Sequence, residues 1–238
     1  SEDILFPIAD FYLKKERWNE AIEVYEEMET IGALQGRGAE YYQKLGYALQ
    51  KNKKYAEAID AYLKADTLKP DNIWNNRHLA ICYRLNRNYQ AALSYYKKVE
   101  EATPEDTNVI FHIGSCLAEL GQYEEAANYF FKLDFIESNC IKAWRGIGWC
   151  SFISRKYEQA MKYYEKIIEQ KPLAIDYMNA GHVAWTMGDI QKAAALYGKS
   201  ITANGNRERF LEMFRKDKEA LLKQGIQEED IPLMLDLL

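Results

Sequence analysis

The sequence predicts an all-α protein built from about six helix-turn-helix units and closed by a C-terminal capping helix. Three observations support this prediction: a short phrase recurs at a fixed period, apolar residues follow helical spacing within each period, and residues that interrupt helices are scarce. The 238 residues include only five prolines and thirteen glycines. Strands and tight turns depend on these residue types, so their scarcity favours helices.

A phrase of one aromatic residue, two variable residues and an alanine recurs, with each alanine 34 residues after the last, at Tyr55–Ala58, Tyr89–Ala92, Tyr123–Ala126 and Tyr157–Ala160. The phase extends backward to Trp18 and Ala21, after a three-residue insertion between Thr30 and Arg37. It extends forward to Ile190 and Ala193, one residue short. A fixed period of this length is typical of stacked structural repeats. The units we expect are residues 2–35, 39–72, 73–106, 107–140, 141–173 and 174–205.

Each unit is expected to hold two short helices that cross closely. In the second unit, apolar residues at helical spacing precede and follow a polar link from Lys51 to Lys54. A small residue stands twelve positions before each alanine of the phrase, at Gly46, Ala80, Gly114, Gly148 and Gly181. A large aromatic stands four positions after the alanine, at Tyr62, Tyr96, Phe130, Tyr164 and Tyr197. Small residues let two helices approach, so the aromatic side chain can reach its neighbour.

The two ends of the array need covering, because a single helix pair cannot bury its own apolar face. Residues 206–238 are expected to do this at the C-terminal end. Asn206 can cap a helix that runs to about Gln224, with Phe210, Phe214 and Leu221 on one face and Gly225 at its end. The leucine-rich segment 231–238, with Pro232 suited to a first helical turn, either completes this cap or docks onto a partner or another copy. At the other end, the first helix is expected to begin near Pro7.

The repeat resembles the tetratricopeptide repeat family, whose 34-residue unit carries Leu-Gly at positions 7 and 8, Tyr at 11, Ala at 20, an aromatic at 24 and Pro at 32. Residues 39–205 follow the pattern closely, the first unit follows it less well, and Pro70, Pro104 and Pro172 close three units. The resemblance implies a right-handed α-α superhelix, or solenoid, in which the first helix of each unit lines a concave face. It implies no enzymatic activity and no cofactor.

The same resemblance implies that positions 2, 5, 6, 9 and 12 of each unit point into the concave groove. These positions hold many aromatic and basic residues, the types that concentrate binding energy at interfaces. The residues expected to bind a peptide or partner segment are Tyr47, Trp74, Arg77, Arg84, Phe111, His112, Lys142, Arg145, Trp149, Asn179, His182 and Trp185.

Four of these residues are cationic although the chain has a formal net charge of -5. Arg77, Arg84, Lys142 and Arg145 would make the groove locally positive, which suits acidic segments or a C-terminal carboxylate. Family members that grip the carboxylate tails of heat-shock chaperones use a fuller set of Lys, Asn and Arg. Here Ile81 and Gly146 replace a required Asn and Arg, so that specific activity is not expected.

The residues that catalysis or metal binding needs are not arranged in any recognisable motif. The sequence has no GxSxG turn, no glycine-rich phosphate loop and no HExxH. We therefore expect no catalytic residues and no metal, with His78 and His112 as solvated or hydrogen-bonded groove residues. Cys82, Cys116 and Cys150 share one repeat position and are expected in the core, whereas Cys140 lies at a link between units, where its exposure is left open, and is expected to be an inert thiol.

These features favour a protein-interaction scaffold or adaptor that is a monomer or a weak dimer. The alternatives are a non-catalytic regulatory or structural portion of a longer protein, and a helical repeat that binds single-stranded nucleic acid. The acidic pI near 5.4 argues against nucleic acid, and no apolar run is long enough for a membrane segment. The cysteine spacing fits a reducing compartment, so we expect a cytoplasmic location. The chain starts at Ser1 without an initiating Met, and we expect the native N-terminus to be missing.

Overall fold

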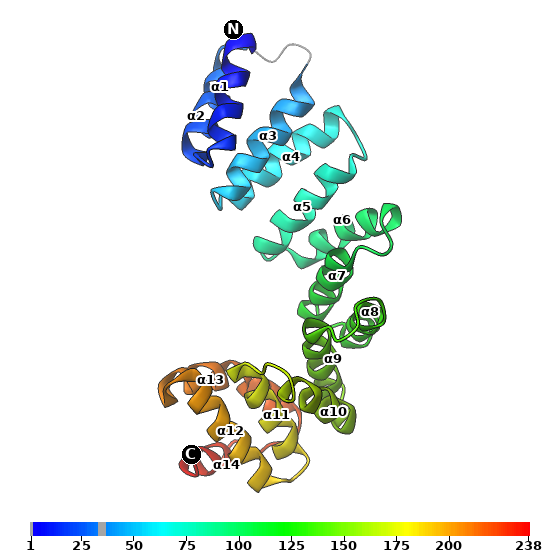
Figure 1. Ribbon diagram of the computed structural model, residues 1–238, viewed down its shortest axis with the longest axis vertical. Coiled ribbons are helices and arrows are strands. Elements are labelled where there is room, and N and C mark those ends of the chain that lie inside the picture. Colours follow the sequence, from blue (N-terminus) through cyan, green and yellow to red (C-terminus); the bar gives the residue numbers. More distant parts are fainter. Residues whose placement is uncertain (1, 33–36) are drawn as a thin grey trace. The chain divides into compact units, whose positions relative to one another are not determined.

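The computed structural model describes residues 2–32 and 37–238, and every regular element in those residues is a helix. The described residues form fourteen helices, of which the first twelve form six consecutive pairs (Figure 1). The insertion expected between Thr30 and Arg37 lies mostly outside the described residues. The prediction of an all-α repeat fold is confirmed.

The helices alternate between first and second members of the pairs. The first members are α1 (Glu2–Lys14), α3 (Gly38–Lys51), α5 (Ile73–Leu85), α7 (Thr107–Glu119), α9 (Ile141–Ile153) and α11 (Ala174–Thr186). The second members are α2 (Trp18–Thr30), α4 (Tyr55–Leu68), α6 (Tyr89–Ala102), α8 (Tyr123–Ile136), α10 (Tyr157–Ile168) and α12 (Ile190–Asn204). Two further helices follow, α13 (Arg207–Lys223) and α14 (Asp230–Asp236).

The turn inside each pair has one backbone geometry that repeats with the sequence period. The same turn position has a left-handed backbone in all six pairs, at Glu16, Lys53, Arg87, Gly121, Arg155 and Gly188. After α3, the Lys54 N–H donates to the Leu49 carbonyl at 2.9 Å, which is the six-to-one hydrogen bond of a Schellman motif. This motif ends each first helix and reverses the chain within two to three residues.

The close crossing of the two helices in a pair depends on the small residues expected from the sequence. A methyl group added to Gly46 would lie 2.8 Å from the Tyr62 ring, and one added to Gly181 would lie 2.5 Å from the Tyr197 ring. Each aromatic thus packs directly on the backbone of the partner helix. The predicted pairing of the small and aromatic positions is confirmed at these two crossings.

Buried aromatic residues form the core and connect consecutive pairs. Tyr25 and Tyr62 are fully buried. The carbonyl of Tyr25 accepts a hydrogen bond from the Tyr41 hydroxyl at 2.7 Å, and the carbonyl of Tyr62 accepts one from Asn75 Nδ2 at 2.9 Å. Each bond runs from a first helix to the second helix of the preceding pair, so it fixes the stacking of neighbouring pairs.

The cysteines are all buried free thiols. Burial raises the pKa of Cys82 and of Cys150 to about 12, as expected for inert core residues. Cys140, whose exposure the sequence left open, is buried, with 7% of the residue exposed, and its thiol donates to a Glu137 carboxylate oxygen at 3.2 Å. Burial raises its pKa as well, as expected for an inert thiol.

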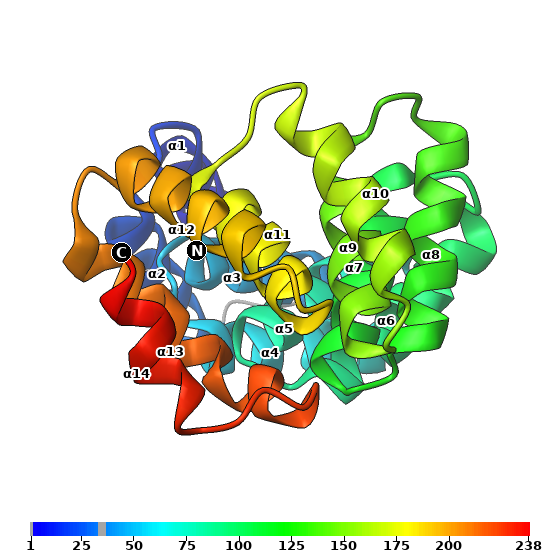
Figure 2. The same cartoon turned by 90° about the horizontal axis from the view of Figure 1, so that it is seen from below.

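The C-terminal end of the array is covered as expected. Asn206 Oδ1 accepts a hydrogen bond from the Arg209 N–H at 2.9 Å and so caps α13. Phe210, Phe214 and Leu221 are buried on one face of that helix, which packs against α11 and α12 (Figure 2). Gly225 follows with a left-handed backbone, and α14 then packs beside α13, with Arg207 donating to the Leu235 carbonyl at 2.8 Å.

The expectation that the first helix begins near Pro7 is wrong. Pro7 lies inside α1, which begins at Glu2. Proline removes one backbone hydrogen bond from a helix interior. The burial of Phe6 and Ala9 in the core shared with α2 outweighs this loss and keeps the helix continuous through Pro7.

Residues 1–116 and 117–238 each form a compact unit, which we call the first and the second unit. This division is coarser than the six repeats and the 206–238 segment expected from the sequence, and we retain those finer borders as a proposal. No helix in the described part of the chain is long and apolar enough to cross a membrane.

Candidate functional site

An exposed group of aromatic rings lies on the first helices of the first unit. Trp74 on α5 is 42% exposed, and its ring centroid lies 4.0 Å from that of His78 and 6.3 Å from that of Tyr47 on α3. The Tyr47 and His78 rings are 5.7 Å apart. We call the surface made by Tyr47, Trp74, Arg77 and His78 the α3–α5 face. Such a surface combines large apolar area with polar edges.

The position of Trp74 is fixed by the start of α5. Asn72 caps the helix, because its Oδ1 accepts a hydrogen bond from the Asn75 N–H at 2.9 Å. Asn75 is itself buried and donates to the carbonyl of Tyr62 on α4. The first turn of α5 is therefore anchored on both sides, and Trp74 extends from this rigid turn.

His78 is held in one orientation from beneath the aromatic surface. Its Nδ1 lies 2.8 Å from Gln50 Oε1, which also accepts a hydrogen bond from the Tyr62 hydroxyl at 2.9 Å. Burial, together with the nearby Lys51 and Arg77 cations, lowers the pKa of His78 to about 4. The imidazole is therefore neutral at physiological pH, with Nδ1 as the donor and Nε2 left as an acceptor.

The cations of the first unit differ in whether they have an acidic partner. Arg77 Nη1 lies 2.9 Å from Asp106 Oδ2, so its charge is already compensated within the chain. Arg84 Nε donates to the Tyr96 hydroxyl at 3.4 Å, and the Lys51 ammonium lies 5.3 Å from the Tyr47 ring centroid. Neither Arg84 nor Lys51 forms an ion pair within the described residues. Their charges lack an acidic partner in the last turns of α5 and α3.

Phe111 and His112 on α7 are half-buried and extend the aromatic residues of the first unit. His112 stacks on the Tyr96 ring at 5.4 Å, and Phe111 meets the His112 ring edge-on at 5.4 Å. Tyr96 is buried in the core. These two residues therefore lie where a first helix packs against the preceding second helix.

In the second unit, Arg145 is held by a buried carboxylate. Its Nε and Nη2 donate to Asp176 Oδ1 and Oδ2, both at 2.7 Å. Asp176 Oδ2 also accepts from the Leu173 N–H at 2.7 Å at the start of α11. This bidentate ion pair connects α9 to α11, so the charge of Arg145 is already compensated within the chain. Lys142 lies 3.5 Å from a carboxylate oxygen of Glu137.

The other predicted residues of the second unit divide into accessible and covered ones. Trp149 and Asn179 are partly exposed, and Trp149 packs beside Phe152 with ring centroids 5.6 Å apart. His182 and Trp185 are buried, and both rings face Phe214 of α13, at 5.4 Å and 6.5 Å. The capping helix therefore covers the two residues that the repeat phase places at the end of the groove.

Gly146 shows why one binding pattern expected from the resemblance is absent. A methyl group at this position would lie 2.5 Å from the Phe130 ring of α8. The arginine that grips carboxylate tails in other family members has no room here unless Phe130 moves.

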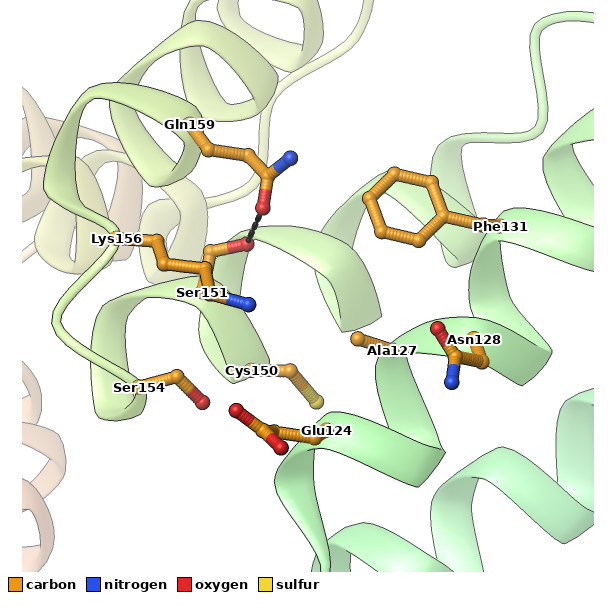
Figure 3. A pocket seen from close by; sticks show the side chains of 9 residues that line it. All are labelled: Glu124, Ala127, Asn128, Phe131, Cys150, Ser151, Ser154, Lys156 and Gln159. Atoms are coloured by element: carbon orange, nitrogen blue, oxygen red, sulfur yellow. Dashed lines mark hydrogen bonds between the residues drawn. The ribbon is translucent and has the colours of Figure 1, made fainter.

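A separate polar pocket of about 220 Å³ lies between α8, α9 and α10 (Figure 3). Ser151 Oγ donates to Gln159 Oε1 at 2.9 Å across its wall, and Cys150 lies at its floor. Because burial raises the pKa of Cys150 to about 12, this thiol is not a nucleophile at neutral pH. The pocket does not place an activated nucleophile beside a base, so it supports no catalytic assignment.

Sequence reasoning missed two residues that support the α3–α5 face and the acidic partners of two arginines. Gln50 stands at position 12 of its unit, one of the inward positions, but its role in orienting His78 has no signature in the sequence. Lys51 was part of an expected polar link, and the last turn of α3 brings it over the Tyr47 ring instead. The partners of the arginines, Asp106 and Asp176, carry no mark in the repeat pattern.

Comparison with known protein families settles which family the repeat represents. Patterns described as tetratricopeptide repeat match residues 5–35, 39–72, 84–150, 141–172 and 177–207. The chain belongs to the tetratricopeptide repeat family. Together these matches cover most of the sequence, including the first repeat, which follows the pattern less well. No curated protein sequence matches this member of the family.

Solved structures with the same fold include a tetratricopeptide repeat protein from Parabacteroides merdae, with a TM-score of 0.68 at 19% identity, covering 99% of this chain and 98% of that one. YrrB, described as having an unusual peptide-binding site, matches with a TM-score of 0.64 at 20% identity, covering 78% and 97%. MamA from MSR-1 matches with a TM-score of 0.63 at 25% identity, covering 71% and 95%.

Proposed function

We propose that this tetratricopeptide repeat protein is a protein-interaction scaffold that binds an extended segment of a partner on the α3–α5 face. The observation that carries the proposal is the exposure of Trp74 within a rigid aromatic group. An exposed tryptophan on an anchored helix turn offers large contact area at a small entropic cost, as in interface hot spots.

The charges beside the face indicate which segments it suits. Arg77 is paired with Asp106, whereas Lys51 and Arg84 have no acidic partner among the described residues. A segment with an apolar or aromatic residue against Trp74 and acidic residues toward Lys51 and Arg84 would complement both features. His78, neutral and fixed by Gln50, leaves an acceptor nitrogen for a backbone N–H of the segment.

The second unit offers a smaller candidate surface. We include Lys142, Trp149 and Asn179 in the proposal as further contacts for a partner. Arg145, His182 and Trp185 are left out, because the first is held by Asp176 and the other two are covered by α13. The peptide-binding site named for YrrB belongs to that protein, and the shared fold supports only that such a scaffold can bind a peptide.

The proposal is tested by selecting displayed random peptides on the immobilised full chain and on its Trp74→Ala variant. Peptides that contact the α3–α5 face are enriched on the wild-type chain and not on Trp74→Ala. The recovered sequences should share an apolar or aromatic residue flanked by Asp or Glu.

A matched control replaces an exposed aromatic elsewhere. Phe135 on α8 is 90% exposed, so Phe135→Ala removes a similar apolar area from a helix that does not form the α3–α5 face. Selection on Phe135→Ala should return the same peptides as the wild type. Peptides recovered equally on Trp74→Ala and on the wild type would contradict the proposal.

A further inference from the structure

The outward surface of α1 carries an apolar stripe that nothing in the described structure covers. Ile4, Ile8 and Phe11 are 63%, 38% and 53% exposed, and their spacing puts them on one side of the helix. In the 34-residue phase they occupy positions 3, 7 and 10 of the first repeat, residues 2–35. Three large apolar side chains along one helix are more than the scattered exposure that is normal for a protein surface.

The same three positions are buried in every other first helix. Their side chains are at most 8% exposed at Tyr41, Leu45, Ala48, Asn75, Leu79, Cys82, Val109, Ile113, Cys116, Ala143, Ile147, Cys150, Asp176, Ala180 and Val183. The exposure of Ile4, Ile8 and Phe11 is therefore a property of α1 alone among the six first helices.

What buries these positions elsewhere is the second helix of the preceding pair. The packed pairs include α2 with α3, α4 with α5, α8 with α9 and α10 with α11. The hydrogen bonds from Tyr41 to the Tyr25 carbonyl and from Asn75 to the Tyr62 carbonyl join position 3 to such a helix. The Tyr96 ring of α6 stacks on His112 at position 6 of the next repeat, so α6 packs against α7 as well. Five internal examples thus show the kind of element that fits this face.

We propose that the Ile4, Ile8 and Phe11 stripe is a docking surface for an amphipathic helix of a partner protein, of the same type as the second helices of this chain. The helix would continue the stacking that the other five first helices already show. Its binding face would carry apolar residues at helical spacing.

The side chains of α1 narrow the chemistry of the partner helix further. Position 10 is Phe11 here, whereas the other first helices have Ala, Cys or Val, so a partner helix with a small residue opposite Phe11 packs best. Lys14 and Lys15 are exposed beside the stripe, and the Lys15 ammonium lies 6.0 Å from the Phe11 ring centroid. Acidic residues next to the apolar face of the partner would complement these two charges.

A second copy of this chain has no suitable helix to offer. In the described residues α2, α4, α6, α8 and α10 each pack against the next first helix, and α12 is covered by α13. Of the exposed leucines at the C-terminal end, Leu233 lies on α14, a helix of only seven residues, and Leu237 follows that helix. The second helices that cover the stripe positions elsewhere are 12 to 14 residues long. These contacts argue against the described helices of a second copy as the source.

The probe is a peptide with the sequence of α6, a second helix of this chain. It is chosen because α6 precedes α7, and α7 has Val109 and Ile113 at positions 3 and 7, where α1 has Ile4 and Ile8; position 10 is Cys116 in α7. A fluorescent peptide with the sequence of residues 89–102, stapled between the exposed positions 90 and 94, is titrated with the full chain and followed by anisotropy. We expect saturable binding that Phe11→Glu weakens tenfold or more. Ile4→Lys serves as a second variant, and circular dichroism checks that each variant is folded.

Two controls separate this surface from the α3–α5 face. Trp74→Ala should leave binding of the stapled helix unchanged, so a failure of the peptide-binding proposal does not affect this one. Phe135→Glu should also bind as the wild type does.

Equal affinity for Phe11→Glu and the wild type, or no saturation up to about 100 µM peptide, would overturn the proposal. Self-association of the chain in sedimentation, abolished by Phe11→Glu, would overturn it as well by showing that a second copy is the occupant.

Discussion

At the residue scale, the turn position inside each pair adopts a left-handed backbone six times, yet only Gly121 and Gly188 are glycines there. Non-glycine residues pay a steric cost in this conformation. We predict that Lys53→Gly stabilises the protein by about 0.5 to 1 kcal/mol, since glycine removes that cost but adds some entropy to the unfolded chain. Urea unfolding measures the change. The neighbouring Lys54 has an ordinary φ of -86°, so Lys54→Gly should give no gain. Stabilisation by both substitutions would contradict the explanation.

The buried His78 predicts a pH effect on stability. Its pKa is lowered to about 4 in the folded protein by burial and by the Lys51 and Arg77 cations, against an ordinary value of about 6.5. Between these pH values the unfolded chain binds a proton that the folded chain does not. The contribution of His78 is therefore present above pH 6.5 and is lost as the pH falls toward 4.

We expect the free energy of unfolding of the wild type to fall more steeply over this pH range than that of His78→Gln. Urea titrations at a series of pH values measure both slopes, and carboxylates that titrate in the same range contribute equally to the two proteins. Identical slopes would show that His78 is not held neutral by the fold.

The identity of the exposed aromatic residues could be predicted from the sequence, because Tyr47 and Trp74 stand at marked positions of the repeat. Whether the arginines at such positions keep an unpaired charge could not be predicted. Arg77 and Arg145 are neutralised by Asp106, which lies just before α7, and by Asp176 in the first turn of α11, and neither aspartate has a fixed place in the pattern. A repeat pattern gives the direction of a side chain but not its partner.

At the element scale, the helix pairs follow directly from the period, and the errors lie at the ends. The capping helix α13 was predictable from its apolar stripe, but its contacts with His182 and Trp185 were not, because both residues also fit the groove positions. The repeat phase alone does not reveal where the groove ends and the cap begins.

The docking of α13 depends on Phe214, which is buried against His182, Trp185, Tyr197 and Phe210. We predict that Phe214→Ala destabilises the protein by about 3 to 5 kcal/mol, through lost burial and the cavity that remains. Urea unfolding measures the loss, and a red shift of tryptophan emission would report the exposure of Trp185.

Lys216→Ala, at an exposed position of the same helix, is the matched control. It should change stability by less than about 0.5 kcal/mol. If Phe214→Ala had an equally small effect, the assignment of α13 as the cover of the array would be wrong.

At the scale of the whole molecule, each helix pair within a compact unit contacts mainly its neighbours in that unit, as the packing of successive helices shows. In such an array a local defect weakens nearby pairs more than distant ones. We predict that Tyr25→Ala, which empties a fully buried position, raises amide hydrogen exchange in α1, α2 and α3 and leaves α11 to α13 unchanged. Tyr197→Ala should give the reverse pattern. A uniform rise along the chain would indicate one cooperative unit instead.

The central claim is that Trp74 makes the α3–α5 face a binding surface, and the most direct test is the affinity of one selected peptide for two proteins. Isothermal titration calorimetry of that peptide against the wild type and Trp74→Ala should show at least a tenfold loss, about 1.4 kcal/mol. Phe135→Ala should bind as the wild type does. Equal dissociation constants for the wild type and Trp74→Ala would contradict the claim.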